Sequence, residues 1–150
     1  MAEQEKYSWL SLIATGLIVW FFAMRMMDGW QIVDVPPRHL FWTYVALIVA
    51  TIVAETAIHS ALAIMRKGER VIHDERDKLI EDRADRNQHV VIIAVINVIV
   101  FHMIAEAAFP GYEFVSADLT RLPALVTFLL GTLYAGHIVK LISTILSYRM

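Results

Sequence analysis

Eight polar side chains lie inside long apolar stretches of this sequence, where each is costly to bury. Placing a charged residue at the centre of a membrane helix costs about 2.5–3.5 kcal/mol on insertion scales, so each such group is expected to have a partner or a function. Carboxylates and imidazoles are the groups that bind metals and transfer protons in proteins. The eight are Arg25, Glu55, His59, Asn97, His102, Glu106, His137 and Lys140.

The spacing of four of these residues predicts an inner polar cluster. Glu55 and His59 are four residues apart and share one helix face, while His137 and Lys140 are three apart on another helix. At about 1.5 Å of helix rise per residue, all four fall in the inner half of a membrane, where Asn97 could join them. Lys140 could pair with Glu55 or extend its amine to the lipid headgroups.

A second group is predicted nearer the outer surface. His102 and Glu106 are four residues apart on one helix face, at about the depth of Arg25. An Arg25–Glu106 ion pair is the structural interpretation of this group. Asn97 lies on the opposite side of the same helix, a side that could face another subunit.

Four interpretations of the inner cluster remain open. It is a structural hydrogen-bonded network, or one of three functional sites. Glu55, His59 and His137 could form a two-histidine, one-carboxylate site for a divalent transition metal such as Fe, Zn or Mn. Two of His59, His102 and His137 could instead hold a haem. The same groups could relay protons or ions, or sense pH, because histidine titrates near neutrality.

The elements that must position these groups are membrane helices. Hydrophobic residues make up 58% of the 150 residues and charged residues 19%, which is more apolar than a soluble domain. Spans are predicted at about 8–27, 40–65, 90–109 and 122–147, each near the 20 apolar residues that cross a bilayer. The expected fold is therefore an all-α, four-helix membrane bundle forming a single domain over residues 1–150.

The distribution of basic residues predicts the orientation. Residues 66–89 contain seven of the thirteen Lys and Arg and seven of the fifteen Asp and Glu. By the positive-inside rule this segment is cytoplasmic, which places both termini in the cytoplasm as well. The resemblance described below implies a prokaryotic inner membrane. The formal net charge of −2 argues against direct binding of nucleic acid.

The cytoplasmic segment is predicted to be mostly helical and to extend the third span. Apolar and small residues recur in it near helical spacing among opposite charges four apart. The segment is then either a solvated extension of the helix or a docking surface for a second copy or another protein. The residues expected to contact a partner are Ile72, Arg76, Leu79, Ile80 and Arg83.

A family resemblance is present in the same segment. The run Asp74-Glu75-Arg76, with Ile80, Ala84 and Arg86 following, matches D-E-R-x-x-x-I-x-x-x-A-x-R. It resembles the signature of small prokaryotic four-span membrane proteins that share a domain of unknown function. The resemblance covers about residues 74–109 and the four-span layout. It implies a companion of helix-turn-helix regulators, such as a membrane tether or signal-responsive antagonist, whereas the three intramembrane histidines are outside the signature.

The sequence contains no motif typical of an enzyme. A G-x-S-x-G elbow and a phosphate-binding Walker loop are both absent, and there is no cysteine. The leading hypothesis is a non-enzymatic accessory protein, oligomeric or partner-binding through its cytoplasmic helix. A metal- or haem-binding protein and a proton relay or pH sensor are the alternatives.

Overall fold

The computed structural model describes residues 3–65, 75–109 and 118–149. Within these ranges the chain forms four α-helices: α1 (Glu3–Met26), α2 (Pro37–Met65), α3 (Glu75–Ala108) and α4 (Leu122–Arg149). All four are long and apolar enough to cross a membrane. Length and composition thus indicate a multi-pass membrane protein, as the hydropathy pattern predicts.

The helix boundaries follow local chemistry. Pro37 is the first residue of α2 and Pro123 the second of α4, positions where the missing N–H of proline costs no helical hydrogen bond. Helix α3 begins at Glu75, so the described part of the charged segment and the third span form one helix of 34 residues. The earlier part of the charged segment, including Ile72, lies outside the described residues.

A short β-hairpin, which the sequence analysis did not predict, follows α1. Strand β1 (Met27–Asp28) pairs antiparallel with β2 (Gln31–Ile32), with Met27 opposite Ile32. Gly29 begins the two-residue turn with a φ of +62°, a conformation that hairpin turns require and that glycine adopts without strain. The hairpin leaves Trp30 97% exposed at its tip.

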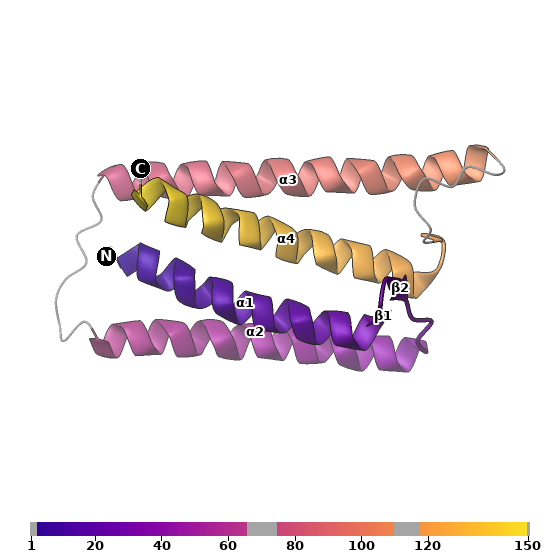
Figure 1. Cartoon of the computed structure of the whole chain (residues 1–150), viewed down its shortest axis with the longest axis horizontal. Helices are drawn as coiled ribbons and strands as arrows, with labels where there is room; N and C mark the ends of the chain where they lie inside the picture. Colours follow the sequence, from indigo (N-terminus) through magenta and orange to yellow (C-terminus); the bar gives the residue numbers. More distant parts are fainter. Residues whose placement is uncertain (1–2, 66–74, 110–117, 150) are drawn as a thin grey trace.

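The helices follow one another across the bundle in the order α3, α4, α1, α2 (Figure 1). Helix α4 packs against α3 and α1, and α1 packs against α4 and α2, so α2 and α3 are the outer helices. Both chain termini lie at one end, here named the termini end, and the hairpin lies at the other, the hairpin end (Figure 1).

Two small apolar clusters occupy the interior towards the hairpin end. Phe22 and Met26 on α1 pack with Leu40 and Leu47 on α2. Ile99 on α3 packs with residues preceding and beginning α4. Large exposed apolar side chains occur along all four helices, which suits contact with lipid chains.

Candidate functional site

The centre of the candidate site is the carboxylate of Glu55 on α2. Its Oε2 accepts a hydrogen bond of 2.6 Å from the Tyr7 hydroxyl, and its Oε1 accepts one of 2.7 Å from Ser11 Oγ. Both donors belong to α1. Hydrogen bonds to a charged acceptor are among the stronger ones in proteins, so this carboxylate is held by two well-matched donors.

Ser11 links this carboxylate to a histidine on the third helix of the site. Ser11 is fully buried, and its Oγ lies 3.4 Å from His137 Nε2 on α4. Because the single hydroxyl proton of Ser11 is donated to Glu55, its oxygen is left to accept a hydrogen bond from the ring N–H. The arrangement therefore assigns the proton to Nε2 and runs from His137 through Ser11 to Glu55.

Aromatic contacts extend the network along the same helices. The ring of Tyr7 stacks on His59 with centroids 5.0 Å apart. One turn before Glu55, Thr51 Oγ1 lies 3.3 Å from the Tyr134 hydroxyl on α4. We call these seven residues the Glu55 network: Tyr7, Ser11, Thr51, Glu55, His59, Tyr134 and His137.

Helical periodicity explains why these side chains meet. Tyr7 and Ser11 are one turn apart, as are Glu55 and His59, so each pair lies on one face. Helix α1 also buries Ser8 and Thr15, at 3% and 4% exposure, on the face that contains Ser11. Small hydroxyl residues at i, i+3 and i+7 thus mark a polar inner face of α1, a signal that the sequence analysis did not use. Tyr7 was not among the polar residues that the sequence pattern placed in the cluster.

Two of the residues expected near the inner cluster lie elsewhere. Asn97 is exposed on α3 and donates from Nδ2 to the carbonyl of Ile93 in its own helix, at 2.8 Å. Lys140 forms an ion pair with Asp85 of α3 rather than with Glu55. The charged segment of α3 runs beside the end of α4, so an acidic partner is available to Lys140 there.

The outer group is brought together only in part. His102 and Glu106 form the predicted i, i+4 pair, with His102 Nε2 and Glu106 Oε2 3.8 Å apart and His102 3% exposed. The Arg25 guanidinium instead lies over the ring of Phe21 on its own helix, 5.5 Å from the centroid. The Arg25–Glu106 ion pair is not formed.

The positions of the histidines can be compared with those that a metal site or a haem site would require. In residues 3–65, 75–109 and 118–149, no three His, Cys, Asp or Glu side chains are grouped to hold a metal ion. Glu55 and His137 are joined by Ser11, whereas His59 is stacked on Tyr7. His59 and His102 lie on the two outer helices, α2 and α3, at opposite edges of the bundle (Figure 1).

The expected partner-binding residues of α3 divide between two faces. Ile80 is 5% exposed and packs inside the chain, so it is not available to a partner as the sequence pattern suggested. Leu79 is 57% exposed, and Arg76 and Arg83 are exposed as well. Ile72 lies outside the described residues.

Side chains from three helices meet at the termini end. The Tyr148 hydroxyl lies 2.6 Å from Asp77 Oδ1 of α3 and 2.5 Å from Gln4 Oε1 of α1. Arg149 reaches Glu5 at 3.7 Å. These contacts fix the end of α4 against the beginnings of α1 and α3.

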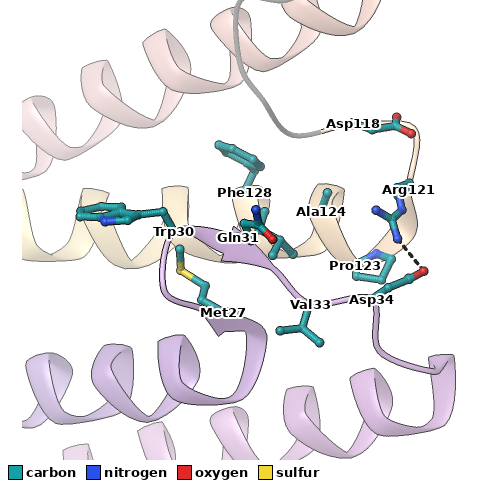
Figure 2. A pocket seen from close by; sticks show the side chains of 11 residues that line it. Met27, Trp30, Gln31, Val33, Asp34, Asp118, Arg121, Pro123, Ala124 and Phe128 are labelled. Carbon is teal, nitrogen blue, oxygen red and sulfur yellow. Dashed lines mark ion pairs between the residues drawn. The ribbon is translucent and has the colours of Figure 1, made fainter.

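A surface pocket of about 300 Å³ lies at the hairpin end, between the hairpin and the start of α4 (Figure 2). Apolar side chains line it, and the ion pair of Arg121 with Asp34, at 2.5 Å, lies at its rim. Asp118 accepts hydrogen bonds from the Thr120 hydroxyl and N–H, which hold the pKa of its carboxyl below the usual value. The pocket is at the lower end of the size range of ligand sites, and its charged groups already have partners.

No protein-family model, curated protein or solved structure matches this chain. Its chemistry therefore has to be inferred from its own side chains. A carboxylate, a serine and a histidine in hydrogen-bonded sequence can accept, store and pass a proton within the membrane. In the part of the chain described here, the Glu55 network is the place where carboxylate, hydroxyl and imidazole side chains from three different helices contact one another.

Proposed function

We propose that this chain is a non-enzymatic accessory protein of a prokaryotic cytoplasmic membrane that senses protons through the Glu55 network. Both termini are cytoplasmic, an orientation supported by the basic residues of 66–89. The observation that supports this proposal is the bonding of the Glu55 carboxylate, which contacts α1 directly and α4 through Ser11.

Protonation of Glu55 changes how α1 is held. The ionised carboxylate accepts from both hydroxyls of α1, whereas a protonated carboxyl must itself donate and so has one acceptor fewer. One of the two hydrogen bonds between α1 and Glu55 then has to reverse its direction or break. Binding of a proton by the hydrogen-bonded residues His137, Ser11 and Glu55 thus alters the packing of α1 against α2 and α4.

The groups around Glu55 and His137 set the electrostatic environment of the network. Tyr7, His59 and Tyr134 belong to the network itself. The neighbouring charged groups outside it are Lys140 of α4 and Asp85 of α3, which form an ion pair. Because Asp85 neutralises Lys140, the lysine charge is partly removed from His137. The Lys140–Asp85 ion pair therefore lies between His137 and the charged residues at the termini end.

The accessory part of the proposal rests on α3. Its charged end presents Arg76, Leu79 and Arg83 to the surroundings, where another protein can contact them. A tether or antagonist role, as the resemblance to the small four-span family implies, requires such a surface. Changes in helix packing at the Glu55 network would reach it through α4, which packs against α3.

Distance measurements at different pH values test the sensing role. The sequence has no cysteine, so spin labels can be placed at Ile64→Cys on α2 and Leu146→Cys on α4, both of which are exposed. In lipid nanodiscs we expect the label distance to change with pH in the parent chain and to stay fixed in Glu55→Gln. Infrared spectra should show a protonated-carboxyl band that this substitution removes.

Glu106→Gln is the matched control, because Glu106 is also a membrane carboxylate beside a histidine but lies outside the network. It should keep the pH-dependent distance of the parent. An identical pH response in Glu55→Gln and the parent, or no response in the parent, would overturn the proposal.

A further inference from the structure

One amide faces outwards from the apolar part of α3. Asn97 is exposed and satisfies one N–H on the Ile93 carbonyl of its own helix. The residue lies about 10 Å into the apolar stretch that begins at Val90, and an amide has a second N–H and a carbonyl oxygen to satisfy besides this bond. Polar groups at this depth in lipid are expensive, and they usually mark contacts between helices.

Asn97 lies in a continuous exposed stripe along α3. Residues spaced alternately three and four apart are all exposed from one end of the helix to the other, the heptad spacing of two helices that pack side by side. The opposite face, with Ile80, Ala84 and Ile99, is buried against the rest of the chain. The stripe consists of Arg76, Leu79, Arg83, Arg86, Val90, Ile93, Asn97, Val100, Ile104 and Ala107.

We propose that the apolar part of this stripe, from Val90 to Ala107, is the interface with a second copy of the chain, centred on an Asn97–Asn97 amide pair. All copies insert into the membrane in the same orientation, so a two-fold axis between them must lie along the membrane normal. Such an axis places each residue of α3 at the same depth as its counterpart. An amide is both donor and acceptor, and two facing amides therefore satisfy each other.

The charged end of the stripe lies outside this interface. The same axis would place Arg76, Arg83 and Arg86 of one copy opposite the same arginines of the other, and like charges that face one another repel. The contact is therefore confined to the apolar part of the stripe, from Val90 to Ala107. This inference goes beyond the proposed function and does not depend on the protonation of Glu55.

Two neighbouring valines provide a matched cross-linking test in the bilayer. Val100 and Val98 are both exposed, at 48% and 56%, but lie about 200° apart around the helix, with Val100 in the stripe. We expect Val100→Cys to form a disulfide-linked dimer on mild oxidation much faster than Val98→Cys. Equal rates, or a product formed only with a different protein, would overturn the proposal.

Substitution of Asn97 tests the amide pair itself. Single-molecule photobleaching in nanodiscs or vesicles should show dimers of the parent chain. Asn97→Leu should raise the dissociation constant about 3- to 20-fold, the range expected for a hydrogen bond between membrane helices. A parent chain that is monomeric at all lipid-to-protein ratios would contradict the proposal, as would an Asn97→Leu chain that dimerises as tightly as the parent.

The two proposals fail separately. Loss of dimerisation in Asn97→Leu with an intact pH-dependent distance would leave the Glu55 network as the sensor. A pH-insensitive chain that still dimerises through Val100 would remove the sensing role and leave the interface in place.

Discussion

The backbone of α4 at Gly136 lies directly against the side chain of Ile92 on α3. A Cβ at position 136 would be 2.6 Å from Ile92 Cγ1 and 2.8 Å from its Cδ1, closer than atoms can approach. Helices α3 and α4 are thus in close contact at a position where an added Cβ would require Ile92 to move.

Gly136→Ala should therefore destabilise the protein. Overpacking costs about 1–3 kcal/mol, and the gain in helix propensity of about 1 kcal/mol offsets only part of it. Thermal or denaturant unfolding in mild detergent measures the difference. Gly131→Ala is the control on the same helix, because its Cβ would meet nothing within 4 Å. If the contact is the cause, adding Ile92→Ala to Gly136→Ala should recover most of the loss.

Removal of the Tyr7 hydroxyl should lower the free energy of unfolding, because it removes one of the two hydrogen bonds to the Glu55 carboxylate. Tyr7→Phe deletes the 2.6 Å hydrogen bond to Oε2 and leaves the ring that stacks on His59. A hydrogen bond to a charged group contributes about 1.5–3 kcal/mol, so unfolding free energy should fall by that order. In a double-mutant cycle the effect should largely disappear in a Glu55→Gln background.

Tyr134→Phe serves as the comparison for this cycle. Its hydroxyl lies 3.3 Å from Thr51, whose own proton is donated to the Leu47 carbonyl at 2.9 Å. We expect a smaller loss than for Tyr7→Phe. An equal loss from both substitutions would mean that aromatic packing, rather than the bond to Glu55, is what matters.

The ion pair between Lys140 and Asp85 should be worth little by itself. Their side chains are 31% and 51% exposed, and pairs of this kind contribute about 0–1 kcal/mol. Exchanging the two residues, as Lys140→Asp with Asp85→Lys, should restore most of the stability that either single change loses. The measurement is the unfolding free energy of the parent, the two single variants and the double variant. A double variant that is no more stable than the single variants would argue against the contact.

Asp118 should make stability depend on pH in the acidic range. Hydrogen bonds from the Thr120 hydroxyl, and then from the Thr120 N–H, lower the pKa of this carboxyl in the folded protein from its usual 3.8. The folded state then favours the ionised form, so the contribution is complete above about pH 4 and is lost as pH falls through the lowered pKa. The difference in unfolding temperature between the parent and Asp118→Asn should narrow on acidification, and a constant difference would contradict this.

The orientation can be tested with single cysteines. Trp30, which is 97% exposed at the hairpin tip, should as Trp30→Cys react with a membrane-impermeant maleimide in intact cells. Leu79→Cys should react only after the membranes are opened or inverted, because the charged end of α3 is placed in the cytoplasm. The reverse pattern would show that the chain is inserted the other way.

The spans could be predicted from the sequence because hydropathy and length decide whether a helix crosses a membrane. The proximity of Glu55 and His137 also followed from their depths, since each was counted from the end of its own helix. The two hydroxyl donors were missed because Tyr7 and Ser11 reach Glu55 only when α1 is rotated to one particular angle about its own axis. The sequence pattern of one helix does not determine that angle, because it depends on packing against α2. Lys140 was expected near Glu55 for the same reason: its partner depends on how α3 lies beside α4. The hairpin was missed although a glycine at the first position of a two-residue turn, as in Gly29-Trp30, is typical of hairpins.

The order of the helices has a consequence for how the chain enters the membrane. Both hydroxyl donors to Glu55 are on α1, which is synthesised and can be inserted before α2. Glu55 can therefore enter the bilayer as part of a helical hairpin that already satisfies its carboxylate, rather than as an isolated charge. His137 is added only with the last helix, so the site is completed at the final step of assembly.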